Sequence, residues 1–315
     1  MPSYLNKFRE FETIAAIDLG SNALRAVIAR KDGDKLEIVK SFREPLRLGE
    51  DVFNNGMISE LKMQKTEEAF IKLFHIFTEY NVTDIKAMAT SAMRDSKNGP
   101  ILAKRIAHST GIEIETIRGN EEAQVIFNAV KSQVNLKRKN AILMDIGGGS
   151  TELILVKNED ILAVESFNVG TVRLLKLDHG PLEKEISNQM EKMIQFIKSH
   201  FKLKDIDLFI GTGGNLRRIG KIRKKILGKP SSELAMFDEI HHMEEAILSM
   251  SYVDRIRRLE LDQNRADVIL PAIMLTHHLM QKLKIEKIHL PKVGLKEGII
   301  LSMLDKTPKV FIMKD

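Results

Sequence analysis

Three short turns rich in small residues each follow an apolar segment, and this arrangement is suited to holding phosphate. The turns are Gly20-Ser-Asn22, Gly147-Gly-Gly-Ser150 and Gly211-Thr-Gly-Gly214. Glycine lets the backbone approach an anion closely, and successive N–H groups of such a turn point into one concavity. A single glycine turn is usually only a tight hairpin. Three in one chain favour phosphate binding.

Two aspartates precede the first two turns at the same offset. Asp18 and Asp145 each stand where an apolar run ends, so they would face each other across a cleft if two similar halves packed together. Carboxylate oxygens are the ligands that Mg²⁺ prefers, and Mg²⁺ commonly accompanies phosphate chemistry. The alternative is that each aspartate only caps its own turn through the backbone.

The elements that must position these residues follow an α/β pattern that occurs twice. Apolar runs at 14–17 and 24–28 predict a hairpin around the first turn, and runs at 141–144 and 153–156 predict an equivalent hairpin around the second. The repeat predicts two α/β domains, each built on its own sheet. We expect them to span residues 1–125 and 126–315, with the last helix, after about residue 298, packing back on the first.

Periodicity predicts the elements between and after these hairpins. In the first half, the expected strands lie at 86–90 and 112–117, and the expected helices at 59–80, 99–110 and 121–131. In the second half, a strand is expected at 208–210, helices at 182–200, 231–250 and 265–283, and a final helix opening at 293–298. Pro271 should start or kink the long apolar helix.

The composition is that of a folded protein of about two domains. With 315 residues and no cysteine, the chain excludes a thiol nucleophile, a thiolate zinc site and an iron–sulfur cluster. Residues 1–10 interrupt their apolar positions with charge, which predicts no signal peptide, and no apolar run approaches the ~18 residues of a membrane span. We therefore expect a cytoplasmic protein without a membrane partner.

The charge and the aromatic content bear on the ligand. A net charge of +6 is compatible with an anionic ligand but does not identify one. No tryptophan and three tyrosines leave few stacking platforms, so nucleic acid binding is not expected.

Seven segments in one order carry a family resemblance that runs from about residue 14 to 300. They are Asp18–Arg25, Ala89–Arg94, Gly119–Ala123, Asp145–Glu152, Gly211–Gly214, Asn264–Val268 and Gly294–Gly298. Together they resemble the motifs of the exopolyphosphatase/guanosine pentaphosphate phosphohydrolase (Ppx/GppA) family of the sugar kinase, Hsp70 and actin superfamily. The resemblance implies two duplicated actin-like (ribonuclease H-like) α/β domains flanking a central cleft.

The resemblance also implies an activity and a set of site residues. By this resemblance, terminal phosphoanhydride hydrolysis would use Glu121 as the base that activates water. Glu122 projects about 100° away on the same helix, so the two cannot both point at one phosphorus, and we expect the base to be Glu121. Glu152 and Arg94 would complete the catalytic set, and Mg²⁺ would be held by Asp145, Glu152 and Asp18. The residues expected to bind phosphate are Ser21, Asn22, Arg25, Gly147, Gly148, Gly149, Ser150, Gly213, Gly214, Asn215 and Arg265.

The chain also departs from the family pattern. Ala23 stands where the family usually has serine, and Asn215 where threonine is common. The chain ends at Asp315 without the C-terminal helical extension of many relatives, so it resembles the short two-domain form. Neither substitution removes a carboxylate, but both would alter phosphate affinity or substrate preference.

Several functions remain open on the sequence alone. Release of terminal phosphate from inorganic polyphosphate is the first choice, and conversion of guanosine pentaphosphate to tetraphosphate is the alternative. A sensor that binds polyphosphate or the alarmone without turnover would keep the glycine turns and the arginines. A kinase of the same superfamily would need an organic acceptor, and nothing in the sequence requires one. A homodimer is left open.

A basic stretch and two histidine pairs are further features of the second half. The basic stretch Arg217–Lys225 follows the third turn, where it either guides a polyanion to the cleft or forms a solvated helix face. The adjacent pairs His241-His242 and His277-His278 lack the i, i+4 spacing with which one helix presents two ligands to a metal. Zinc is therefore not expected.

Overall fold

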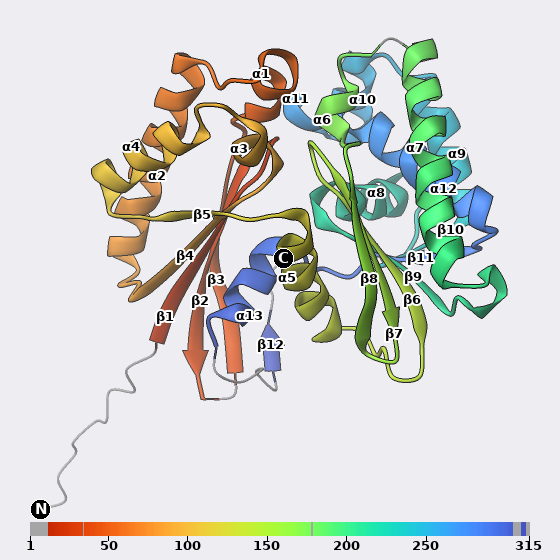
Figure 1. Ribbon diagram of the computed structural model, residues 1–315, viewed down its shortest axis with the longest axis horizontal. Helices are drawn as coiled ribbons and strands as arrows, with labels where there is room; N and C mark the ends of the chain where they lie inside the picture. Colours follow the sequence, from red (N-terminus) through yellow and green to blue (C-terminus); the bar gives the residue numbers. More distant parts are fainter. Residues whose placement is uncertain (1–11, 34, 178, 305–309, 313–315) are drawn as a thin grey trace, which may run out of the picture.

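Two six-stranded sheets lie side by side, each with its own helices (Figure 1). This computed structural model describes residues 12–33, 35–177, 179–304 and 310–312. Residues 1–10, in which the sequence predicts no signal peptide, lie outside the described residues. Among the described residues, no helix is both long and apolar enough to span a membrane.

The first sheet has the spatial order β12-β3-β2-β1-β4-β5. Strands β1, β2 and β3 form an antiparallel meander, and β4 and β5 continue the sheet parallel to β1. The elements of this half are β1 (Glu12–Leu19), β2 (Leu24–Asp32), β3 (Lys35–Glu44), α1 (Leu48–Asn55), α2 (Glu60–Glu79), β4 (Asp84–Ala89), α3 (Ser91–Asp95), α4 (Gly99–Thr110), β5 (Ile114–Thr116) and α5 (Gly119–Lys131), with β12 (Val310–Ile312) at the edge.

The second sheet has the order β10-β11-β9-β6-β7-β8. Its elements are β6 (Asn140–Ile146), β7 (Thr151–Lys157), β8 (Asp160–Phe167), α6 (Thr171–Leu174), α7 (His179–His200), η1 (Leu203–Asp205), β9 (Leu208–Thr212), α8 (Gly213–Ile226), β10 (Leu234–Met236), α9 (Phe237–Leu248), α10 (Tyr252–Leu259), α11 (Gln263–Ala266), α12 (Ile269–Leu283) and β11 (Lys287–His289). The chain then returns to the first sheet, where α13 (Leu295–Ser302) packs against β1.

The two sheets repeat one topology. In each, an antiparallel meander of three strands is followed by strands parallel to the first, so β3-β2-β1-β4-β5 corresponds to β8-β7-β6-β9-β11. The two predicted hairpins are present, and in each the first strand ends in the aspartate and the turn that the sequence singled out. The expected duplicated α/β fold is therefore confirmed.

Helices α5 and α13 pack against each other between the two sheets, and they share one apolar core with both. This core includes Val27 of the first sheet, Leu143 of the second, Ile126 of α5 and Ile299 of α13. Because the four side chains are fully buried, both halves of the chain hold α5 and α13 in place. Residue 125 lies within α5, so a division of the chain at this position stays a prediction.

Most expected elements are present, and the differences have local causes. The predicted helix at 231–250 begins only at Phe237, because Leu234–Met236 pairs with β11 as an edge strand. The predicted helix at 265–283 is two helices, α11 and α12, and Pro271 lies in the first turn of the second, where its missing N–H costs nothing. The strand expected at 112–117 is only Ile114–Thr116.

Candidate functional site

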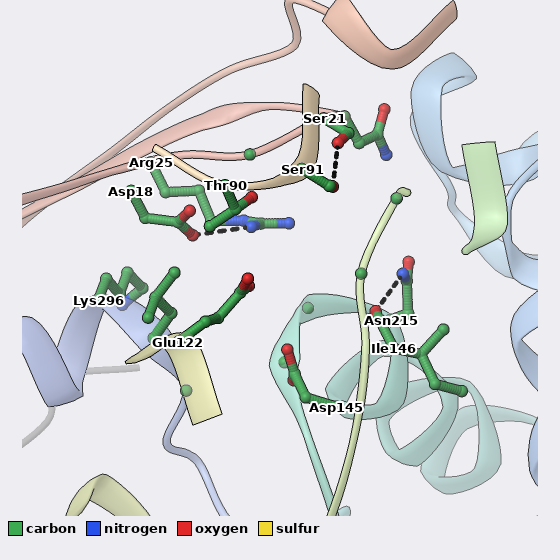
Figure 2. A pocket seen from close by; sticks show the side chains of 18 of the residues that line it. Asp18, Ser21, Arg25, Thr90, Ser91, Glu122, Asp145, Ile146, Asn215 and Lys296 are labelled. Atoms are coloured by element: carbon green, nitrogen blue, oxygen red, sulfur yellow. Dashed lines mark hydrogen bonds and ion pairs between the residues drawn. The ribbon is translucent and has the colours of Figure 1, made fainter. Parts of the chain in front are cut away.

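The three predicted turns meet in one pocket between the halves (Figure 2). The first two turns follow β1 and β6, and the third joins β9 to α8, so all three lie at the carboxyl ends of parallel strands. Helix α8 begins at Gly213, and α13 begins at Leu295 after Gly294, and these residues line the same pocket. Helix N-termini present unpaired N–H groups and a partial positive charge, which suits a phosphate.

Two glycines of these turns have steric reasons to be glycine. Gly213 has a φ of +82°, and a Cβ there would lie 2.2 Å from Asp145 Oδ1. A Cβ on Gly149 would lie 2.3 Å from the Phe53 ring and 2.5 Å from Ser91 Oγ. Gly149 therefore acts by letting the second turn approach α1 and α3 closely.

The first turn is tied to the start of α3, which follows β4. Ser21 Oγ lies 2.8 Å from Ser91 Oγ and accepts a hydrogen bond from Ala92 N–H at 3.1 Å. Arg25 donates from Nη1 to Asp18 Oδ2 at 3.0 Å, because the two residues are register partners on β1 and β2. The Arg25 guanidinium is thereby fixed beside Gly214 of the third turn.

Three carboxylates from three elements converge on the other side of the pocket. One oxygen each of Glu122, Asp145 and Glu152 lie within 4.8 Å of one another, and all three residues are buried. Thr212 donates to Asp145 Oδ1 at 2.9 Å, and Ser166 donates to Glu152 Oε1 at 2.9 Å. The second oxygens of Glu122 and Glu152 have no hydrogen-bond partner. We call these three residues the carboxylate cluster.

The electrostatics of the carboxylate cluster disfavour three negative charges. Burial raises the pKa of Glu152 to about 7, and the nearby Asp145 carboxylate adds to the shift. Burial, with a contribution from Asp18, raises the pKa of Asp145 to about 6. Burial and the charges of Glu152 and Asp145 raise the pKa of Glu122 well above its ordinary value. A cation bound at the cluster would remove this repulsion.

The donors of the carboxylate cluster fit Mg²⁺. Hard divalent cations take oxygen ligands, and the unpartnered oxygens of Glu122 and Glu152 are such ligands in a buried position. Asp18, which the sequence analysis also assigned to the metal, is not part of the group, because its carboxylate is paired with Arg25. The geometric group therefore contains Glu122 and not Asp18, and the assignment of Asp18 to the metal stays a prediction.

The two adjacent glutamates of α5 lie in different surroundings, and Glu122, not the predicted base Glu121, lines the pocket. Glu122 is 6% exposed and projects into the pocket (Figure 2). Glu121 is exposed, and its Oε2 accepts the Arg118 N–H at 2.7 Å at the start of the helix. Glu121 therefore caps the helix end, while Glu122 has the position that a base in the cleft requires.

The other predicted residues are distributed as follows. Most of the phosphate-binding set lines the pocket, namely Ser21, Asn22, Arg25, Gly147, Gly148, Ser150, Gly213, Gly214 and Asn215. Asn215, the departure from the family pattern, donates to Ile146 O at 2.8 Å and so braces the second turn.

Two predicted arginines do not line this pocket. Arg94 donates to Ile117 O at 2.9 Å and lies 3.9 Å from Glu122. Arg265 lies outside this pocket, beside Asp262 at 3.1 Å.

Several pocket residues were not predicted as site residues. Thr90, Ser91, Lys296 and Glu297 belong to two of the recognised segments, where their position after β4 and in the first turn of α13 was the available signal. Arg217 belongs to the basic stretch that the sequence analysis left undecided, and it lies 3.5 Å from Glu297. Three cations, Arg25, Arg217 and Lys296, thus line the same pocket as Glu122 and Asp145, and Glu297 pairs with two of them.

A second, strongly basic pocket continues from the first. The two share Arg25, Gly214, Arg217, Lys296 and Glu297. Eight of the residues that line the second pocket are lysine or arginine, and one, Glu297, is acidic. We call it the basic pocket. Its cations are Arg25, Arg43, Arg217, Arg218, Lys221, Arg265, Lys292 and Lys296.

The raised pKa values predict how stability depends on pH. Carboxyls whose pKa is higher in the folded than in the unfolded protein stabilise the fold below about pH 4, and this stabilisation is lost as pH rises through 6 to 7. The shift of Asp145 alone corresponds to about 3 kcal/mol. We therefore expect the melting temperature of metal-free protein to fall between pH 5 and 8 by several degrees, and Mg²⁺ to reverse the fall.

Thermal melts with EDTA or Mg²⁺ across this pH range would check the expectation. Glu152→Gln should flatten the metal-free profile, because it removes one of the titrating groups. A metal-free melting temperature that rises steadily from pH 5 to 8 would contradict the account.

The chain matches known proteins along most of its length. A model of the Ppx/GppA phosphatase family matches residues 27–307. A guanosine-5'-triphosphate,3'-diphosphate pyrophosphatase from Pseudoalteromonas translucida is 25% identical over 92% of this chain and 59% of its own length. A bifunctional 3-dehydroquinate synthase/phosphatase from Fusobacterium nucleatum is 30% identical over 84% of this chain and 43% of its own length. The chain thus spans about half the length of these curated relatives.

Solved structures share the fold along nearly their whole length. An exopolyphosphatase from Cytophaga hutchinsonii superimposes with a TM-score of 0.86, at 24% identity, over 93% of this chain and 98% of its own. A Ppx/GppA protein family member from Aquifex aeolicus gives a TM-score of 0.76, at 24% identity, over 93% of this chain and 97% of its own. The two-domain architecture is common to them.

Proposed function

Because this chain belongs to the Ppx/GppA phosphatase family, we propose that it hydrolyses terminal phosphoanhydride bonds and that its substrate is inorganic polyphosphate. One observation carries the proposal. The buried carboxylate cluster lies beside a pocket that is lined by three cations and by the three glycine turns. The basic pocket continues from this pocket. Phosphoryl transfer to water needs an oriented nucleophile and neutralised phosphate oxygens, and this pocket has groups for both.

Glu122 is the general base in this proposal. It extends from the first turn of α5 toward Asp145 across the pocket (Figure 2), and its Oε2 has no hydrogen-bond partner. Once it is ionised, this carboxylate can take a proton from the attacking water. Arg94, 3.9 Å from Oε2, favours the ionised form.

Asp145 and Glu152, together with water molecules, would hold Mg²⁺ beside the base Glu122. When bound, the ion neutralises charge on the phosphate oxygens and lowers the pKa of water. Thr212 and Ser166 orient the Asp145 and Glu152 carboxylates through the hydrogen bonds described above, so two of these ligands are positioned before any ion arrives.

The terminal phosphate would bind opposite the carboxylates. The N–H groups at the starts of α8 and α13 point into the pocket, and Arg25, Arg217 and Lys296 surround it. Arg25 is held by Asp18, so its guanidinium can contact a phosphate without losing much side-chain entropy. These contacts would fix the scissile bond in line with the water beside Glu122.

The basic pocket is the reason for preferring polyphosphate. Burial lowers the pKa of Arg43 and of Arg218, and the Nε atom of each has no hydrogen-bond partner. Keeping such groups desolvated is costly, and Asp262, 3.5 Å from Arg43 Nη1, compensates them only in part, so a bound anion would stabilise them further. A linear polyanion that enters from the first pocket would place successive phosphates against these arginines.

Lengthening the substrate tests this role of the basic pocket. We expect Lys221→Ala combined with Arg265→Ala to raise KM for long polyphosphate by about tenfold, because charge-assisted contacts to the distal phosphates are lost. The kcat value should change little, and the effect should vanish for tripolyphosphate, which is too short to reach both positions.

Initial rates of phosphate release at several chain lengths would provide these values. The matched control is Lys282→Ala, an exposed lysine on α12 away from both pockets. An equal change of KM at all chain lengths would assign the two cations to the terminal phosphate instead.

Hydrolysis of guanosine pentaphosphate is the second candidate. It is favoured by the similarity to the Pseudoalteromonas guanosine-5'-triphosphate,3'-diphosphate pyrophosphatase. The basic pocket also offers Phe42 as a surface on which a base could stack. Phosphate release measured side by side on polyphosphate and on guanosine pentaphosphate distinguishes the two candidates.

A further inference from the structure

A second group of metal-binding side chains lies between α9 and α12, outside both pockets. Ligand atoms of Glu244, His277 and His278 lie within 4.8 Å of one another. Helix α9 supplies the glutamate and α12 supplies both histidines, and the two helices pack directly on each other in the second half (Figure 1). None of the three residues lines the pocket of the proposed function or the basic pocket.

The buried members of this group have polar atoms that lack partners. Glu244 and His277 are each 7% exposed. Glu244 Oε2 contacts His277 Nδ1, but neither atom makes an aligned hydrogen bond, and His277 Nε2 has no partner either. An unpaired polar atom in a buried position costs free energy, which a ligand between the two helices would recover.

A hydrogen bond to the backbone sets the tautomer of His278. Its Nδ1 lies 2.8 Å from Met274 O, and since a carbonyl oxygen only accepts, Nδ1 must donate the proton. In the neutral ring, Nε2 then carries the lone pair. A ring N–H bonded to a backbone carbonyl is the usual arrangement behind a metal-bound histidine.

Stacking fixes the ring of His277. The Phe237 ring lies 5.1 Å from it and the His241 ring 5.0 Å, at interplanar angles of 26° and 28°. The ring therefore has little freedom to turn its nitrogens toward solvent. The Phe237 and His241 rings also lie 6.4 Å from each other, so the three rings form one cluster, and Glu244 is a polar group that His277 contacts beside it.

We propose that Glu244, His277 and His278 bind one zinc ion that links α9 to α12. Imidazole nitrogens with one carboxylate are donors typical of Zn²⁺, whereas Mg²⁺ prefers oxygen alone. Bonds of about 2.0–2.2 Å set ligand atoms roughly 3–3.5 Å apart, so the contact between Glu244 and His277 must lengthen when the ion binds. Three protein ligands leave the fourth position to water.

Zinc content in the presence of Mg²⁺ tests the proposal. Saturating Mg²⁺ occupies the carboxylate cluster, so that zinc retained by the full-length chain after dialysis reports the second group. We expect one zinc per wild-type chain and a loss of affinity of more than about 100-fold in His277→Gln and in Glu244→Gln. The matched control is His242→Gln, which changes an exposed histidine of α9, the helix that carries Glu244.

X-ray absorption at the zinc edge decides the question even where a variant fails to fold. The wild-type zinc should show two imidazole ligands, and it should raise the melting temperature of the wild type but not of the two variants. An all-oxygen zinc environment, equal zinc content in His277→Gln and wild type, or no zinc in the wild type would overturn the proposal.

Discussion

Replacing Glu122 with glutamine will lower the rate of phosphate release from polyphosphate by about 10²–10⁴-fold. Glutamine keeps the shape of the side chain but cannot take a proton from water. The corresponding change of the neighbour, Glu121→Gln, will leave the rate close to that of the wild type, because this side chain points out of the cleft and caps α5.

The pair of variants forms a matched comparison, since both change one carboxylate to an amide in the first turn of one helix. Steady-state rates with polyphosphate and Mg²⁺ at pH 8 give the result, and melting temperatures check that both variants fold. Glu121→Gln should cost a little stability through the weakened cap. A large loss of rate in Glu121→Gln, with Glu122→Gln active, would restore the sequence-based assignment.

Replacing Glu152 with glutamine will remove most of the stabilisation by Mg²⁺ and lower the rate of phosphate release by about 10²–10³-fold. Glu152 is fully buried, its Oε2 has no hydrogen-bond partner, and the residue belongs to the carboxylate cluster that would take an ion. In the absence of Mg²⁺ the same variant will be more stable than the wild type at pH 8, because one of three repelling charges is gone.

Asp18→Asn is the control for this metal site. Asp18 is buried in the same pocket but paired with Arg25, so the variant should keep its affinity for Mg²⁺. Calorimetric titration with MgCl₂ would compare the three proteins. Equal loss of Mg²⁺ binding in Asp18→Asn and Glu152→Gln would make Asp18 a ligand, as the sequence suggested.

The sequence was sufficient to predict the hairpins and the α/β repeat, because the apolar runs and the small-residue turns are both local signals. Strands β3 and β8 were missed for the opposite reason. Both are third strands of a meander, and their burial alternates irregularly along the strand, so their hydrophobic pattern is weak. The edge strand β10 has three residues and is defined by its pairing with β11, which no local pattern encodes.

The position of the glutamates required a boundary that the sequence did not provide. Two adjacent helical residues point in different directions, and which one faces the cleft depends on where the helix begins and how it packs. The structure starts α5 at Gly119, so that Glu121 occupies the capping position and Glu122 faces Asp145. Glutamate three residues after the residue that precedes a helix is itself a capping signal, and it would have favoured this outcome.

The three proposed zinc ligands could not be predicted from spacing within one helix. His277 and His278 are neighbours, and their partner Glu244 stands on another helix more than thirty positions away. Only the packing of α9 against α12 brings the three together. The basic stretch Arg217–Lys225 posed a similar problem. Arg217, Arg218 and Lys221 line the basic pocket, whereas the other residues of the stretch do not.

The most direct test of the central claim is phosphate release by the wild-type chain with Mg²⁺, measured side by side on long-chain polyphosphate and on guanosine pentaphosphate. The account predicts hydrolysis of both with a higher kcat/KM for polyphosphate, since only that substrate extends along the basic pocket. Preference for the nucleotide would contradict the choice of substrate. Tight binding of both without any release of phosphate would contradict the hydrolase itself and leave a sensor.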